Sequence, residues 1–168
     1  VILLTVMILW GPFDIKGPAN AAQKTASASK TNEEDEKMEM DFKDETYKKE
    51  DGIGVIYLAG GCFWGLEKLM QNIPGVIRGT SGYANGDPSL RPTYKEVCTG
   101  RTGYRETVRV EYSEDRISLD AILFTFFAAI DPTVRNRQGN DIGSQYQTGV
   151  YYTDERSGAT VAHVAGVE

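Results

Sequence analysis

The alternation of apolar and polar residues predicts a folded domain that begins near Ile53. Residues 55–59 form an apolar run of strand length, and residues 63–71, which follow a short glycine-rich turn, are good helix formers. Residues 76–83 are typical of a strand weakened by its glycines. Residues 107–112 alternate between polar and apolar, which indicates a strand with one buried face.

A second helix is predicted after Ser118, a residue type that caps helix N-termini. Its apolar residues recur at the spacing of one helix face: Leu119, Ile122, Leu123, Phe126, Phe127 and Ile130. Residues 149–153 predict a last strand, and Asp154 or Ser157 begins a helix that we expect not to be completed before Glu168. The order strand, helix, strand, strand, helix, strand implies an α+β two-layer sandwich, with helices packed on a mostly antiparallel sheet.

The N-terminal third has a different composition. Residues 1–10 are almost wholly apolar but too few to span a bilayer, and residues 19–21 supply a small-x-small cleavage pattern. We therefore expect residues 1–21 to be an export signal or the remnant of a membrane anchor, with its first residues missing; the alternative is a buried strand. Residues 22–52 are polar and highly charged, which predicts a flexible tether before a domain over residues 53–168.

The charge is concentrated in the tether. The chain carries a formal net charge of −6, and residues 30–51 hold ten acidic residues against five lysines. The domain itself is nearly neutral and has no basic stripe, which argues against nucleic acid as a partner. Two cysteines and one histidine fit neither a disulfide framework nor a zinc site, so we expect no metal and no cofactor.

The candidate chemistry lies in the turn Gly60-Gly61-Cys62-Phe63-Trp64-Gly65. Cys62 falls where the first strand becomes the first helix, and the free N–H groups of a first helical turn favour an anion such as a thiolate. The two aromatic residues that follow predict a pocket for a small apolar group. A buried structural cysteine is the alternative, and the flanking glycines and aromatic residues favour the nucleophile.

This turn resembles the active-site signature of the A-type peptide methionine sulfoxide reductases. Further blocks follow in the order and spacing of that family, and together the resemblance covers about residues 53–155. The blocks are Gly82-Tyr83-Ala84-Asn85-Gly86, Pro92-Thr93-Tyr94-Lys95-Glu96-Val97-Cys98, Thr102-Gly103-Tyr104-Arg105-Glu106, Asp131-Pro132 and residues 136–146. The resemblance implies a ferredoxin-like core and the reduction of methionine S-sulfoxide, in proteins or as the free amino acid, as a repair of oxidative damage.

The resemblance also implies roles for single residues. The Cys62 thiolate would attack the sulfoxide sulfur and become a sulfenic acid. Glu106 matches the family's acid, and burial would raise its pKa enough to keep a proton at neutral pH. The hydroxyls of two tyrosines would donate to the oxygen, an aspartate would orient the site by hydrogen bonds, and two aromatic residues would hold the S-methyl group. These residues are Tyr94 and Tyr146, then Asp141, then Phe63 and Trp64.

Each of these residues also has an ordinary alternative. Glu106 leads into an alternating strand and could face solvent, because glutamate is mostly exposed. Tyr94, Tyr146 and Asp141 could be surface groups of loops. Their joint occurrence in the order of the family is what favours the functional interpretation.

The chain departs from the family at two places. Many members have histidine where this chain has Tyr104 and Ile130, from which we expect tuning without loss of activity. No cysteine follows Cys98, which matches a non-catalytic position, so the resolving thiol must come from elsewhere. The candidates are a thioredoxin-like or other thiol reductant, a cysteine beyond Glu168, and a downstream B-type reductase domain.

Two rival functions stay open at this point. A cysteine peroxidase would use the same nucleophile, although peroxide needs neither a tyrosine pair nor an aromatic pocket. A module that binds oxidised methionine without turnover is the other. If residues 1–21 direct export, we expect the protein to work outside the cytoplasm or in the cell envelope, either free or tethered to the membrane.

Overall fold

The computed structural model describes residues 14–16 and 51–167. The predicted tether and most of the predicted export signal lie outside these described residues. The sheet contains five strands: β1 Asp14–Lys16, β2 Ile53–Ala59, β3 Val76–Ala84, β4 Arg105–Ser113 and β7 Gly149–Tyr151. The helices are α1 Phe63–Gln71, α2 Tyr94–Val97, α3 Leu119–Ala129 and α4 Glu155–Val167. A hairpin of β5 Arg137–Gln138 and β6 Asp141–Ile142 precedes the 3₁₀ helix η2 Ser144–Tyr146.

The topology is that of a ferredoxin-like core. The elements β2, α1, β3, β4, α3 and β7 follow one another in the order strand, helix, strand, strand, helix, strand, and the spatial order of the strands is β7-β2-β4-β3. All three pairings among these strands are antiparallel, and β1 adds a parallel pairing at the edge of β7. The predicted α+β class and the mostly antiparallel, mixed sheet are therefore confirmed.

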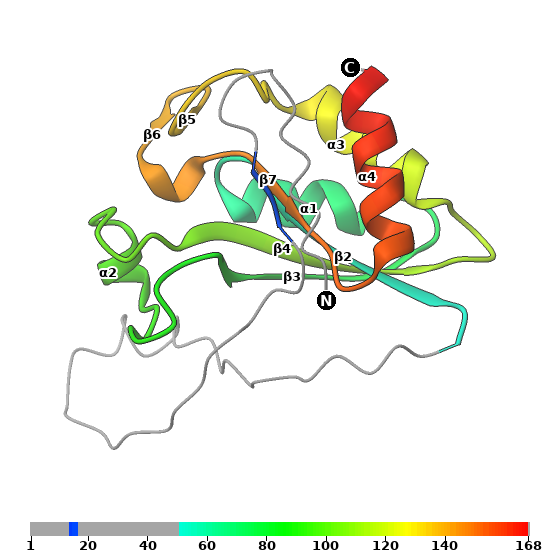
Figure 1. Ribbon diagram of the computed structural model, residues 1–168, viewed down its shortest axis with the longest axis horizontal. Coiled ribbons are helices and arrows are strands. Elements are labelled where there is room, and N and C mark those ends of the chain that lie inside the picture. Colours follow the sequence, from blue (N-terminus) through cyan, green and yellow to red (C-terminus); the bar gives the residue numbers. More distant parts are fainter. Residues whose placement is uncertain (1–13, 17–50, 168) are drawn as a thin grey trace.

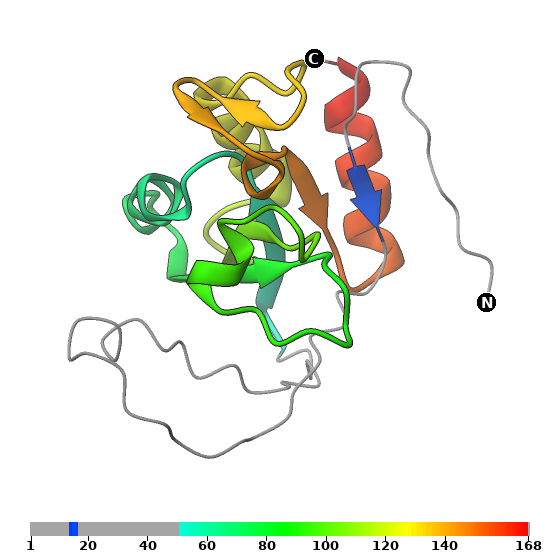
Figure 2. The same cartoon turned by 90° about the vertical axis from the view of Figure 1, so that its left-hand side faces the viewer.

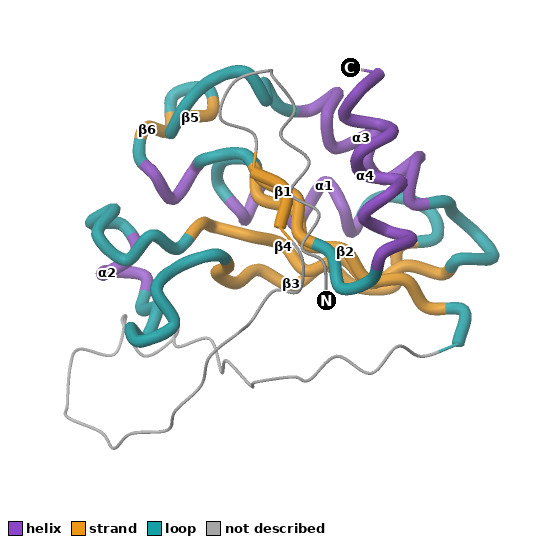
Figure 3. The backbone as a smooth tube through the Cα atoms, viewed as in Figure 1, coloured by secondary structure: helices purple, strands orange, loops and turns teal. Residues whose placement is uncertain are grey.

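The core lies between the sheet and its helices, which form the second layer (Figures 1 and 3). Alternation along the strands sends Ile56 and Leu58 of β2 and Val108 and Val110 of β4 to the helix side, where all four are fully buried. The helices contribute the other half of this core: Phe63, Leu66 and Met70 from α1, Leu119, Ile122, Leu123, Phe126 and Phe127 from α3, and Val161 and Val164 from α4. One continuous apolar layer thus holds all three long helices.

The predicted first and second helices agree with α1 and α3, and the Ser118 hydroxyl accepts the hydrogen bond from Ala121 N that caps α3. The helix predicted to begin at Asp154 or Ser157 is α4, which begins at Glu155, runs to Val167 and buries Val161 and Val164. Its many alanine and glycine residues weaken the helical spacing of large apolar residues by which such a helix is predicted from the sequence. The short elements α2, β5, β6 and η2 were not predicted, since local pattern carries little signal for them.

Residues 14–16 form β1 inside the segment predicted as an export signal, where they pair with residues 149–151. Among the described residues, no helix has the length and hydropathy needed to cross a membrane.

The matched pair Phe126→Ala and Phe124→Ala tests this layer. Phe126 is fully buried, so its truncation is expected to lower the free energy of unfolding by about 3–5 kcal/mol. Phe124 lies on the same helix with 43% of its surface exposed, so the same truncation should cost about 1 kcal/mol or less. Urea denaturation of both variants measures the difference, and equal losses would contradict this assignment of the core.

Candidate active site

Four strand ends meet at one edge of the sheet, and the candidate residues gather there. Because the core strands are antiparallel, the ends of β2 and β3 lie beside the starts of β4 and β7. Three paired positions define this edge: Leu58 with Val108, Ala59 with Gly149, and Tyr83 with Glu106. Figure 2 looks onto this side of the molecule, where α1, η2 and α2 surround the same edge.

Cys62 occupies the N-cap position of α1, directly after β2, and is partly exposed. Gly61 precedes it with a φ of +87°, a left-handed conformation that favours glycine. A Cβ atom at Gly61 would also lie 2.8 Å from side-chain carbons of Gln138. The hairpin of β5 and β6 therefore packs directly against the turn that presents the thiol.

Glu106 lies next to this turn although it is 44 positions later in the sequence. Its Oε2 accepts a hydrogen bond of 3.0 Å from the backbone N–H of Phe63, which follows Cys62. Its side chain is only 2% exposed, because Glu106 points to the same face of β4 as Val108 and Val110. The alternative of a solvent-facing carboxylate is thus excluded, and the alternation along the strand already carried that signal.

Burial is the main influence on the Glu106 carboxyl and raises its pKa above the ordinary value. The hydrogen bond from Phe63 N acts in the opposite direction, because it stabilises the carboxylate. The negative charge of Asp141 raises the pKa further. The net effect favours a protonated acid beside the thiol.

Tyr94 begins α2, and its ring stacks on Trp64 with centroids 6.1 Å apart and an interplanar angle of 17°. Thr93 fixes the start of this single turn, because its hydroxyl accepts from the Glu96 N–H and donates to the Glu96 carboxylate. Burial and the hydrogen-bonded Cys98 raise the pKa of Tyr94 to about 12. Its hydroxyl therefore stays protonated and can donate a hydrogen bond at any physiological pH.

Tyr146 ends η2, between β6 and β7. Burial raises the pKa of Tyr146, and the charges of Glu106 and Asp141 raise it further. The strand β4, which carries Glu106, packs against η2. Asp141 is exposed on β6, and its charge raises the pKa of both Glu106 and Tyr146. The orienting hydrogen bond expected of it stays a prediction.

The two predicted substrate-binding aromatic residues have unequal positions. Phe63 is 1% exposed, and its ring lies 5.6 Å from the rings of both Trp64 and Tyr83. Trp64 is 53% exposed. Trp64 therefore offers an open aromatic face beside Cys62, whereas Phe63 is part of the core that supports it.

Tyr83 is a member of this site that sequence reasoning did not assign. It pairs with Glu106 across β3 and β4, and its ring packs on Phe63. Burial and the Glu106 charge raise the pKa of its hydroxyl well above the ordinary tyrosine value. Its block was recognised in the sequence, but only the register of the two strands shows which residue it faces.

The two residues that depart from the family pack against backbone near the site. The ring of Tyr104 covers Gly86, where a Cβ atom would overlap it, and its hydroxyl lies 3.4 Å from the Leu90 carbonyl. Ile130 lies against Gly60, at the start of the cysteine turn. Both side chains thus brace backbone near the site by packing.

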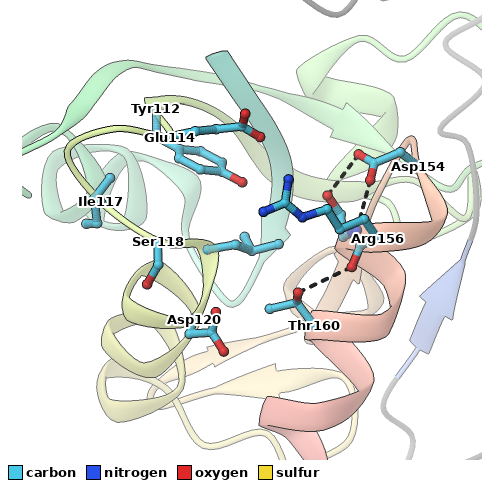
Figure 4. Close-up of a pocket in the computed structure, with 10 residues that line it drawn as sticks. Tyr112, Glu114, Ile117, Ser118, Asp120, Asp154, Arg156 and Thr160 are labelled. Atoms are coloured by element: carbon cyan, nitrogen blue, oxygen red, sulfur yellow. Dashed lines mark hydrogen bonds between the residues drawn. The ribbon is translucent and has the colours of Figure 1, made fainter. Parts of the chain in front are cut away.

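A cavity elsewhere lies between the end of β4 and the N-termini of α3 and α4. Figure 4 shows that Asp154 accepts two hydrogen bonds from Ser157, while the Thr160 hydroxyl donates to the Arg156 carbonyl. These bonds brace the first turns of α4, so we assign this cavity no chemistry. Within residues 14–16 and 51–167, no three His, Cys, Asp or Glu side chains are grouped as metal ligands.

Among curated proteins, MsrA of Mycoplasma pneumoniae is 52% identical over 99 residues, which cover 59% of this chain and 62% of that protein. MsrA of Clostridium botulinum strain Hall is 52% identical over 101 residues, which cover 60% of this chain and 64% of that protein. Both are described as peptide methionine sulfoxide reductases. The chain thus spans less than two thirds of the length of these relatives.

Two solved structures are similar to the whole fold. Methionine sulfoxide reductase A of Corynebacterium diphtheriae is 38% identical, with a TM-score of 0.62 over 70% of this chain and 58% of that one. Mxr1 of Saccharomyces cerevisiae in its reduced form is 32% identical, with a TM-score of 0.67 over 73% and 72%. The family of peptide methionine sulfoxide reductases matches residues 54–166, which include every candidate site residue. The chain therefore belongs to the peptide methionine sulfoxide reductase family.

Proposed function

We propose that this chain reduces methionine S-sulfoxide, free or within proteins, by attack of Cys62 on the sulfoxide sulfur. The observation that carries the proposal is the hydrogen bond from Phe63 N to the buried Glu106. It brings an acid with a raised pKa next to the N-cap cysteine. A sulfoxide oxygen is a poor leaving group until it is protonated, so a nucleophile and an acid that is bound to the backbone N–H of the next residue meet the needs of this reaction.

The step balances within the site. The Cys62 thiolate forms a bond to the methionine sulfur, Glu106 gives its proton to the sulfoxide oxygen, and the S–O bond breaks to leave a sulfur–sulfur sulfonium and hydroxide. The hydroxide then attacks the Cys62 sulfur, and the S–S bond breaks with its electron pair going to methionine. The oxygen ends as the hydroxyl of a Cys62 sulfenic acid, so the cysteine sulfur is oxidised and the methionine sulfur is reduced. The hydroxyls of Tyr94 and Tyr146 stabilise the charge on the oxygen by donating hydrogen bonds.

Trp64 gives the site its preference for a small apolar group. Its half-exposed ring lies beside Cys62, and stacking on Tyr94 fixes its orientation. The S-methyl group of the substrate would pack on this face while the oxygen points towards Glu106. The buried ring of Phe63 packs against the indole of Trp64 and limits its movement.

A dithiol must return Cys62 to the thiol after each turnover. One thiol attacks the sulfenic acid and releases water, and the second thiol resolves the mixed disulfide. We propose a thioredoxin-like protein for this step, or a B-type reductase domain that follows this domain in the same protein.

Export of the protein is a separate part of the proposal. The apolar residues 1–10 and the small residues 19–21 support an export signal, and the polar, charged residues 22–52 support a tether to the membrane or the cell envelope. Cleavage after Ala21 would also remove β1 and free the outer edge of β7. The mature protein would then repair methionine outside the cytoplasm.

Replacing Cys62 by serine is expected to abolish reduction, because a hydroxyl is far less nucleophilic than a thiolate at neutral pH. The assay uses S- and R-sulfoxides of methionine and hydrogen peroxide, each with a small dithiol as reductant. The wild type should turn over the S-sulfoxide, and a dimedone adduct on Cys62 should be found by mass spectrometry. Turnover of peroxide alone would favour the peroxidase, and binding without product would favour a binding module.

Replacing Glu106 by glutamine is expected to slow sulfenic acid formation by about 10²-fold or more, the usual scale for a positioned acid. If Glu106 is the acid, the wild-type rate should fall as pH rises through the raised pKa of Glu106. The rate of the variant should not show this fall. Single-turnover rates between pH 5 and 9 measure both. Glu111→Gln, on the outer face of the same strand, is the matched control and should leave the rate unchanged.

The stability of the same variant gives a folding control. Because the folded-state pKa of Glu106 is raised, its contribution to stability is fully present below the unfolded pKa and is lost as pH rises through the folded one. Glu106→Gln has no such loss, so its unfolding free energy relative to wild type should increase with pH. The stability difference between the variant and wild type should therefore shift in favour of the variant from pH 5 to pH 8. A shift in the opposite direction would indicate that the substitution damages the fold.

Fusion to a reporter enzyme that is active only outside the cytoplasm tests the export signal. Residues 1–51, with an added initiating methionine, are expected to give an active exported reporter, because the apolar run is the part read by the export machinery. Residues 22–51 serve as the matched control and should leave the reporter inactive. Equal activity of the two fusions would argue against a signal in residues 1–21.

A further inference from the structure

Tyr83 is the cross-strand neighbour of the buried acid. It lies directly opposite Glu106 in the antiparallel pairing of β3 with β4. Residues opposed in this way point to the same face of a sheet, so Tyr83 lies on the helix side, which Glu106 shares with Val108. Tyr83 accordingly packs against the main core as a partly buried residue, whereas Glu106 is only 2% exposed.

The two residues form a pair of the close, non-hydrogen-bonded kind. Earlier on β3, the Ser81 N–H and the Gly79 carbonyl bond to side chains of α1 at 2.8 and 3.1 Å, so both point away from β4. Backbone direction repeats every two residues along a strand, so the backbone of Tyr83 also points away from β4. Opposed residues of this kind have Cα atoms about 4.5 Å apart, which is the shorter antiparallel spacing.

Phe63 joins the same two side chains from the α1 side. Its backbone N–H donates to Glu106 Oε2 at 3.0 Å, and its ring lies 5.6 Å from the ring of Tyr83 with an interplanar angle of 36°. Strand register and helix packing therefore bring the ring of Tyr83 to the Glu106 carboxyl independently of each other.

Beyond Tyr83 lies the edge of the sheet. In the sheet that the structure describes, β3 is the last strand, and β4, which carries Glu106, is the next strand inward. Tyr83 is partly exposed at this edge, and its ring lies between the carboxyl and the solvent. Water stabilises the charged form of a carboxyl, so a ring that excludes water favours the protonated form.

We propose that Tyr83 is a positioning residue whose ring shields the Glu106 carboxyl from water at the edge of the sheet and so keeps it protonated for the sulfoxide oxygen. This role rests on the proposed function, in which Glu106 is the acid. It belongs to the aromatic ring and does not require the hydroxyl. Burial is the largest influence on the pKa of Glu106, and Tyr83 supplies that burial on the β3 side.

Other ionisable groups also face Glu106. They are Cys62 at the N-cap of α1, Tyr94 on α2, Tyr146 on η2 and Asp141 on β6. Tyr94 and Tyr146 have raised pKa values, so both keep their protons between pH 5 and 9. Deprotonation of Cys62 raises the rate as pH rises, which separates it from the fall in rate that Glu106 causes. These four groups are the same in every variant that tests Tyr83.

Tyr83→Thr tests the shield, because threonine removes the ring and keeps a high strand propensity. The fall in the single-turnover rate should move to lower pH by about one unit or more, since water replaces part of the apolar cover. One unit is a factor of ten in the protonated fraction, so the rate should drop about tenfold at pH 9 and much less at pH 5. Tyr83→Phe keeps the ring and should retain the wild-type profile.

Tyr152→Thr is the matched control. Tyr152 is another partly buried tyrosine that packs against the same core, and its ring covers Gly158 of α4, where a Cβ atom would lie 2.6 Å from it. It follows the end of β7, at the opposite end of that strand from the site. Its truncation should lower stability without moving the pH at which the rate falls.

Infrared spectra give a second readout that needs no turnover. The carbonyl band of the protonated Glu106 carboxyl is identified by its absence in Glu106→Gln. In Tyr83→Thr this band should disappear at lower pH than in wild type, whereas in Tyr83→Phe and Tyr152→Thr it should not shift. Tyr83→Val, a milder truncation, serves for both measurements if Tyr83→Thr does not fold.

Three results would overturn the role: a truncated variant whose rate falls at the wild-type pH, a Tyr83→Phe profile shifted as far as that of the truncation, or an equal loss of rate at every pH. A wild type that makes no methionine from sulfoxide and dithiol would remove the proposed function, and this role with it. An active wild type with any of the three results would remove only the role of Tyr83.

Discussion

The hydrogen bond between the Phe63 N–H and the Glu106 carboxyl is the interaction on which the site depends. It joins the first turn of α1 to the start of β4 and spans 43 positions of the chain. A backbone group holds the acid, so no flexible side chain intervenes between it and the cysteine turn. Every other site residue is arranged around these two segments.

This bond also sets an electrostatic balance. The N–H favours the carboxylate, whereas burial and the charge of Asp141 favour the protonated acid, and burial is the larger effect. The first turn of α1 meanwhile presents the Cys62 thiol from the N-cap position. One helix terminus therefore both presents the nucleophile and orients the acid.

Much of this arrangement could be predicted from the sequence. Apolar periodicity placed α1, α3 and the strands, the ferredoxin-like core followed from their order and the family blocks, and the turn before α1 identified Cys62. The alternation along β4 also indicates that Glu106 is buried, because Glu106 lies on the same face of the strand as Val108 and Val110. These features are local, since they depend on backbone geometry and on which face of one element is apolar.

Other features were decided only by the tertiary structure, because they depend on which side chains meet across distant parts of the chain. Nothing local distinguishes the buried Phe63 from the exposed Trp64, and the strand register alone places Tyr83 opposite Glu106. The helix α4 is stable through its packing on the core and shows only a weak pattern of its own. The sequence by itself thus determined the elements and the nucleophile, whereas long-range pairing of strands determined which groups surround the sulfur.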